Sequence, residues 1–106
     1  MDKFTKILCV CRNGYSRSVG TRMCLNKRGY RNVIAIGGEN TTILTMGMLC
    51  NWADVILLAK PTHEKFITFG NRDKVNKEFT IGEDVWFNPY NKKLHKIVDK
   101  ELDKIL

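Results

Sequence analysis

"FTKILCVCRNGYSRSVG", residues 4–20, joins a short apolar run to a polar segment that contains a cysteine, two arginines and two serines. The apolar part, residues 4–10, has little periodicity and polar neighbours, which is typical of a buried parallel strand. From Ser18 onward the sequence favours a helix that ends near Gly29. The stretch therefore predicts a strand, a polar loop and a helix N-terminus in direct succession.

The rest of the chain continues the alternation of strand and helix. The predicted elements are strands at 32–38, 54–60 and 74–82, and helices at 41–53, at 61–69 and from Pro89 to the end with Asn88 as N-cap. In the helix at 41–53, Leu44, Met48 and Trp52 share one apolar stripe. The βαβαβαβα order predicts an α/β fold, a three-layer sandwich with a four-stranded parallel sheet and helices on both faces. Ligands of such folds bind outside the carboxyl ends of the strands, where the segment after residue 10 lies.

Size and composition bound the class of protein. The chain has 106 residues, a size typical of one domain, so we expect residues 1–106 to form a single domain. The hydrophobic fraction of 43% is enough for a packed core. No apolar run approaches the ~20 residues that span a bilayer. Since the first residues also lack the features of a signal peptide, we expect a cytoplasmic protein that does not bind membranes.

The charge favours anionic partners. The formal net charge is +7 at pH 7, but the basic residues are scattered along the chain, and no nucleic-acid-binding motif is present. We therefore favour a phosphorylated protein or a small phosphomonoester as partner, and regard nucleic acid as a less favoured one.

The cysteines are interpreted as free thiols. They stand at positions 9, 11, 24 and 50, in a chain without secretory context. We expect Cys9, Cys24 and Cys50 in the core, and we expect His63 and His95 on helix surfaces. The first two cysteines are too close together for the usual zinc spacing, so neither a metal nor a cofactor is predicted.

The polar segment has the design of a phosphate cradle. Loop amides between a strand and a helix can form an anion nest, and the helix dipole adds positive charge at its start. Arg17 supplies a planar fork of donors that matches two phosphate oxygens. The same dipoles and Arg17 favour the thiolate form of Cys11, and Ser18 can donate a hydrogen bond to it. A thiolate in line with a bound phosphate is a nucleophile for phosphoryl transfer.

These residues carry a family resemblance. Cys11 to Ser18 matches C-x5-R-S, the phosphate loop of protein tyrosine phosphatases, and its place after the first strand resembles the low-molecular-weight class. "AIGG" (35–38) and "NWADVILLAKPTHEKF" (51–66) resemble segments of the short bacterial and phage-type branch of that class. The resemblance implies a tyrosine phosphatase with a phosphocysteine intermediate at Cys11, and phosphate or sulfate held by Arg17 and the loop. The implied substrate-binding residues are Arg12, Asn13, Gly14, Tyr15, Ser16 and Ser18.

The chain also departs from the family pattern. The family usually has Gly-Asn in the loop where this chain has Asn13-Gly14, and a left-handed backbone there suits glycine equally well. The position of the family's second loop cysteine is Ser16 here, so the usual redox-protecting pair is missing.

The general acid is the larger question. The family's Asp-Pro is replaced by Asn88-Pro89, and an asparagine cannot transfer a proton at neutral pH. The shorter branch resembled above carries its acid in an Ile-Pro-Asp segment, which Ile81-Gly82-Glu83 matches in place. Our first choice for the acid is Asp84, and Glu83 is the close alternative. Trp86, Phe87 and Tyr90 either pack against the last helix or wall the cleft beside an aromatic phospho-ring, and both interpretations stay open.

Three functions compete with a phosphatase. An inactive phosphate-loop module that binds phosphopeptide, nucleotide or nucleic acid is favoured by the missing Asp-Pro and the net charge. Arsenate reduction needs resolving cysteines in a later segment, and no cysteine follows Cys50. Phosphocysteine carrier subunits of sugar phosphotransferase systems lack an arginine at this spacing and rank last.

Overall fold

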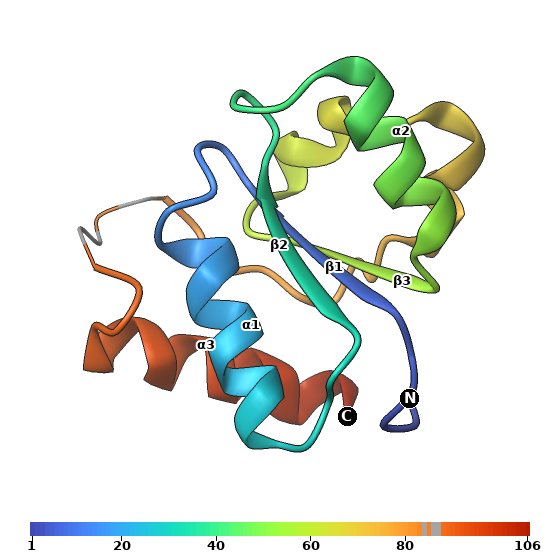
Figure 1. Cartoon of the computed structure of the whole chain (residues 1–106). Helices are drawn as coiled ribbons and strands as arrows, with labels where there is room; N and C mark the ends of the chain where they lie inside the picture. Colours follow the sequence, from blue (N-terminus) through green and yellow to red (C-terminus); the bar gives the residue numbers. More distant parts are fainter. Residues whose placement is uncertain (84, 86–87) are drawn as a thin grey trace.

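A computed structural model of the chain describes residues 1–83, 85 and 88–106. Its sheet consists of parallel strands in the spatial order β2-β1-β3 (Figure 1). The strands are β1 (Ile7–Cys11), β2 (Val33–Gly37) and β3 (Val55–Leu58). The prediction of a parallel α/β fold is confirmed. The prediction of four strands is wrong, because the sheet formed by the described residues has three.

The segment predicted as the fourth strand, residues 74–82, meets β3 in an isolated bridge between Ile56 and Val75. Directly after this bridge, the side chain of Asn76 accepts a hydrogen bond of 3.0 Å from the amide of Glu78. Such a local side-chain turn competes with a continued ladder and bends the chain away from the sheet. The segment approaches the sheet again further on, where the amide of Ile81 donates to the oxygen of Ala59, the residue after β3, across 2.8 Å.

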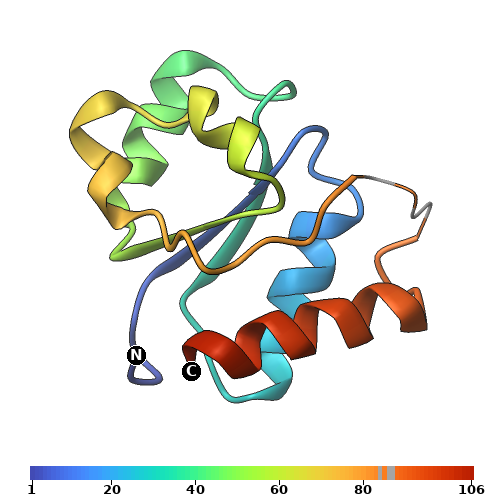
Figure 2. The same ribbon diagram turned by 180° about the vertical axis from the view of Figure 1, so that it is seen from behind.

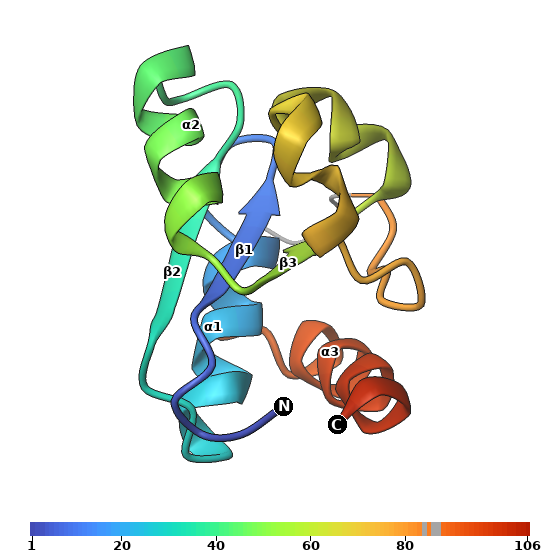
Figure 3. The ribbon, with the colours of Figure 1, turned by 90° about the vertical axis from the view of Figure 1, so that its right-hand side faces the viewer.

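The helices pack on two faces of the sheet, on either side of the fully buried β1 (Figure 3). Ile7 and Cys9 belong to one apolar cluster and Leu8 and Val10 to another, as the alternation of side chains along a strand requires. The first cluster packs with helices α1 (Arg17–Lys27) and α3 (Lys92–Ile105). The second packs with α2 (Ile43–Trp52) and the connection after β3. That connection contains two 3-10 helices, η1 (Pro61–Phe66) and η2 (Phe69–Lys74).

Two details of the helices differ from the sequence-based expectation. Of the stripe predicted in α2, Leu44 and Met48 face solvent, 76% and 64% exposed, whereas Trp52 is half-buried against the second cluster. Met46 and Cys50 are the buried residues of this helix. The mostly apolar helix offers two candidate faces, and only packing against the sheet selects one. Asn91, not Asn88, caps α3, because its side chain accepts hydrogen bonds from the amides of residues 93 and 94.

In the described part of the chain, no helix has the length and hydrophobicity needed to cross a membrane.

The chain after η2 brings distant residues to the carboxyl end of the sheet. Residues 79–83 run back toward the start of α1 (Figure 2). The amides of Ile81 and Gly82 both donate to Ala59 O, directly after β3. Arg17 donates from Nη1 to Gly82 O across 2.7 Å. These contacts hold Glu83 next to the loop that follows β1.

Candidate functional site

Cys11 is the last residue of β1, and its side chain is only 2% exposed. The amide of Gly14 donates a hydrogen bond of 3.1 Å to Cys11 Sγ, and Ser18 Oγ also lies 3.1 Å from the sulfur. Both partners can donate to a thiolate, and α1 begins at Arg17 with its positive dipole end directed at the loop. The surroundings of the sulfur thus contain the donors that stabilise a thiolate.

The loop rests directly on the end of β2. Gly14 has a φ of 77°, and a Cβ on Gly37 would stand 2.2 Å from the carbonyl carbon of Asn13. Asn40 Nδ2 donates to Asn13 O across 2.6 Å, and the amide of Glu39 donates to Arg12 O across 2.9 Å. Segment 37–40 therefore fixes the shape of the loop, and the left-handed position falls on the glycine of Asn13-Gly14 as expected.

Arg17 is 2% exposed although it carries a full charge. Its Nη1 donates to Gly82 O, while Nε is buried and has no hydrogen-bond partner among the described residues. A buried polar atom without a partner is unusual in a native structure. Arg17 thus retains donor capacity at the loop that an oxyanion can use.

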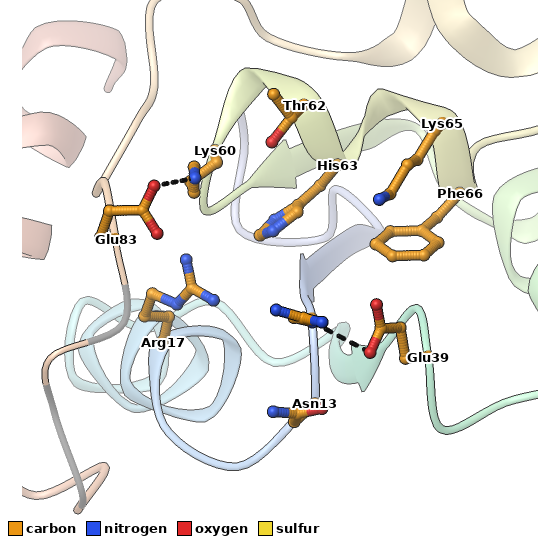
Figure 4. A pocket seen from close by; sticks show the side chains of 10 residues that line it. Asn13, Arg17, Glu39, Lys60, Thr62, His63, Lys65, Phe66 and Glu83 are labelled. Atoms are coloured by element: carbon orange, nitrogen blue, oxygen red, sulfur yellow. Dashed lines mark hydrogen bonds and ion pairs between the residues drawn. The ribbon is translucent and has the colours of Figure 1, made fainter.

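An open pocket of about 450 Å³ lies in front of the loop (Figure 4). We call it the cleft. It is lined by Arg12, Asn13, Arg17, Glu39, Lys60, Thr62, His63, Lys65, Phe66 and Glu83. One wall comes from the loop, the start of α1 and the segment after β2, and the other comes from η1 and the residue before it. Cys11 is not one of the lining residues, because it is buried at the base of the loop.

Glu83 reaches the cleft as an ion pair with Lys60. The hydrogen bond from Lys60, together with its charge, lowers the pKa of Glu83 below the ordinary glutamate value. Arg17 and His63 act in the same direction. Glu83 is therefore a carboxylate at the rim of the cleft, on the side of Arg17 (Figure 4). Asp84, the first choice for the acid, lies outside the described residues.

His63 contradicts the expectation of a surface histidine, because it is 5% exposed. Its ring lines the cleft and its Nδ1 has no hydrogen-bond partner among the described residues. Burial, and then the positive charges of Arg17, Lys60 and Lys65, lower the pKa of His63 to about 4. The imidazole is thus neutral at physiological pH. His95 is half-buried, and its Nε2 lies 2.6 Å from Pro89 O.

The remaining predicted site residues are distributed around the loop. Arg12 is exposed at the cleft and forms an ion pair of 2.9 Å with Glu39. Tyr15 is 74% exposed, while Ser16 and Ser18 are buried. Of the three aromatics considered for the wall, Tyr90 is 70% exposed, and Trp86 and Phe87 lie outside the described residues.

The wall formed by η1 was missed by sequence reasoning. Lys60, Lys65 and Phe66 line the cleft together with His63. Phe66 packs so closely on the end of β2 that a Cβ on Gly38 would stand 2.2 Å from its ring. The sequence did contain one signal for this wall, because η1 directly follows β3. The carboxyl ends of neighbouring parallel strands lie at the same edge of the sheet, so a segment after β3 is expected near the loop after β1.

The other cysteines take no part in the cleft. Cys9, Cys24 and Cys50 are buried in the apolar clusters, as expected, and no disulfide is formed. Burial raises the pKa of each of these thiols, to about 11 for Cys24. Three or more His, Cys, Asp or Glu side chains grouped as metal ligands are not found within residues 1–83, 85 and 88–106.

Comparisons with known proteins bear on the fold. No protein-family model matches the chain, and no curated protein matches it. A similar solved structure is the crystal structure of the Erwinia amylovora tyrosine phosphatase AmsI, with a TM-score of 0.62 and 17% sequence identity. The similarity covers 95% of this chain and 93% of that one. The chain therefore has the fold of a bacterial tyrosine phosphatase over nearly its whole length.

Proposed function

We propose that the protein is a phosphomonoester hydrolase, acting on phosphotyrosine through a phosphocysteine intermediate at Cys11. The observation that carries the proposal is the environment of the sulfur. Cys11 Sγ accepts a hydrogen bond from the Gly14 amide and lies 3.1 Å from Ser18 Oγ, at a helix start that carries the buried Arg17. The fold that the chain has in common with a tyrosine phosphatase supports the same activity.

The proposed reaction has two steps. The Cys11 thiolate attacks phosphorus, an S–P bond forms, and the P–O bond to the leaving group breaks while an acid protonates the leaving oxygen. Water then attacks phosphorus with its proton going to the same carboxylate, the S–P bond breaks, and inorganic phosphate and the thiolate are released. Arg17 and the loop amides hold the charged oxygens through both steps, so that the donors face the charge as it develops.

The proton carrier is assigned to the Glu83–Asp84 carboxylates. Support for Glu83 comes from its place on the rim of the cleft beside Arg17. Support for Asp84 comes from the sequence alone. The aromatic ring of the substrate has a partner in Phe66, which lines the cleft.

Hydrolysis of p-nitrophenyl phosphate in the presence of a metal chelator tests the proposal. We expect turnover by the unaltered protein, and Cys11→Ser should abolish it while phosphate affinity is kept. Turnover that survives Cys11→Ser overturns the thiolate mechanism. Of Glu83→Gln and Asp84→Asn, the variant that removes the acid should lower kcat by about 10²–10⁴-fold.

A second function is favoured by the ion pair between Lys60 and Glu83. Because Lys60 lowers the pKa of Glu83, this residue is ionised at neutral pH and is a poor proton donor there. A protein that lacks an effective acid would bind phosphopeptide or nucleotide with slow turnover or none. Tight phosphopeptide binding without hydrolysis between pH 5 and 8 would favour this function.

A further inference from the structure

The wall of the cleft that faces the phosphate loop is itself cationic. Lys60 precedes η1, and His63 and Lys65 lie within it, so three basic side chains line the cleft from one short segment (Figure 4). None of them belongs to the loop that is proposed to hold the phosphate. This wall therefore raises the question of what it binds.

The charges in the cleft are unbalanced. Four cations, Arg12, Arg17, Lys60 and Lys65, line it together with two carboxylates. The carboxylates are already engaged, since Glu39 pairs with Arg12 and Glu83 pairs with Lys60. Arg17 is the proposed phosphate ligand. For Lys65, no carboxylate of a described residue lies within ion-pair distance, and its Nζ lies 5.2 Å from the centroid of the Phe66 ring.

His63 provides an independent observation. The side chain is 5% exposed, its ring is directed into the cleft, and its Nδ1 is without a partner among the described residues. Buried polar atoms in native proteins are nearly always satisfied, so a cleft-lining side chain with an unsatisfied nitrogen has hydrogen-bonding capacity left for a ligand. A neutral imidazole can donate its N–H to an oxyanion, in the same way as a backbone amide does.

We propose that His63 and Lys65 form a second anion subsite, which binds the carboxylate of an acidic residue next to the phosphotyrosine of a peptide substrate. The inference rests on the proposed function and adds a substrate preference to it. Phe66 packs on Gly38 and lies beside Lys65 (Figure 4), so an aromatic phospho-ring has an apolar contact in the cleft next to the second anion position. This arrangement favours a peptide that brings a second negative charge into the cleft together with the phosphorylated ring.

Two phosphotyrosine peptides test the proposal. One has glutamate and the other glutamine at the positions flanking the phosphotyrosine, and they are otherwise identical. The unaltered protein should show a kcat/KM about three- to tenfold higher for the glutamate peptide, the size expected for one partly exposed, charge-assisted contact. Lys65→Ala should bring the ratio of the two values close to one. His63→Gln should lower the same ratio. The ratio is the readout because it cancels any general loss of activity.

Lys100→Ala is the matched control, because it removes the same charge from an exposed lysine on α3, on the opposite side of the sheet. This variant should keep the ratio of the unaltered protein. Equal values for the two peptides, or an equal loss of preference in Lys65→Ala and Lys100→Ala, would overturn the subsite.

The same peptides separate this inference from the proposed hydrolysis. Their binding to the Cys11→Ser protein can be measured by calorimetry, without any turnover. A preference for the glutamate peptide that disappears with Lys65→Ala supports the subsite even when the unaltered protein fails to hydrolyse either peptide. The absence of a preference in binding overturns it even when hydrolysis is observed.

Discussion

Gly14 and Gly37 are in direct backbone contact, although they belong to the loop after β1 and to the end of β2. A Cβ added to Gly14 would stand 2.6 Å from the nitrogen of Gly37, and a Cβ on Gly37 would stand 2.5 Å from the nitrogen of Gly14. Neither position has room for a side chain. The shape of the proposed phosphate loop therefore depends on a glycine outside the loop itself.

Gly37→Ala should disrupt this contact. The new methyl group meets backbone atoms, which cannot move aside as a side chain can, so we expect a loss of about 1–3 kcal/mol of unfolding free energy. The affinity for phosphate should fall as well, because the loop must shift. Gly70→Ala is the control, since a Cβ there has no atom within 4 Å. Urea unfolding and phosphate inhibition of p-nitrophenyl phosphate hydrolysis measure both effects, and equal behaviour of the two variants would contradict the prediction.

Asn40→Ala should loosen the loop with little effect on the fold. Asn40 Nδ2 donates to Asn13 O across 2.6 Å, and a hydrogen bond of this kind contributes about 0.5–1.5 kcal/mol. We expect a higher KM for p-nitrophenyl phosphate and a smaller change in kcat. Asn32→Ala removes a comparable bond to Phe4 O, 2.9 Å long and remote from the cleft, and should leave KM unchanged. A KM that responds equally to both variants would speak against a role of Asn40 in positioning the loop.

Lys60→Met should change the pH dependence of turnover. Lys60 lowers the pKa of Glu83 by a hydrogen bond and by its charge, so its removal lets that pKa rise toward the ordinary value of about 4.3. A general acid acts in its protonated form, which is lost as the pH rises through its pKa. The falling limb of kcat against pH should therefore move to higher pH. Lys100→Met serves as the control, and a limb that does not move in Lys60→Met would identify a group other than Glu83 as the acid.

His63 should take up a proton more readily when an anion is bound. The pKa of His63 in the free protein is lowered to about 4, by burial first and then by nearby positive charges. Arg17, Lys60, Lys65 and Glu83 are the charged groups that act on it, and Arg12 and Glu39 line the same cleft. An added anion favours the charged imidazolium and so raises this pKa.

Titration of the His63 ring by nuclear magnetic resonance, with and without phosphate, measures the shift. His95 is the internal reference, because it lies on α3 and does not line the cleft. Identical His63 titrations in the two conditions would contradict an anion at the cleft.

The chain's order of elements could be predicted because each depends on a contiguous stretch. The Cys11–Ser18 segment follows an apolar strand and runs into a helix, so the hydrophobic pattern locates it without tertiary information. The capping signal at Ser18 did not locate the helix start, because α1 begins at Arg17. The prediction of a fourth strand was wrong because the turn made by the Asn76 side chain competes with strand pairing. The apolar pattern of the segment contains no information about this competition. Leu44 and Met48 on α2 were assigned to an apolar stripe but are exposed. The sequence of a largely apolar helix does not single out one face for burial.

The sequence by itself determined a parallel α/β order and the loop between β1 and α1, with Cys11, Gly14, Arg17 and Ser18, the residues of the proposed cradle, supplied by one stretch. Tertiary structure decided what faces that cradle. Arg17 meets Gly82 across 65 residues, and the η1 wall arrives from another strand end. The physical reason is that burial and hydrogen bonding between distant segments select their positions, as they do for His63, which no local pattern distinguishes from a surface histidine. The cleft thus formed from segments that have no sequence pattern in common.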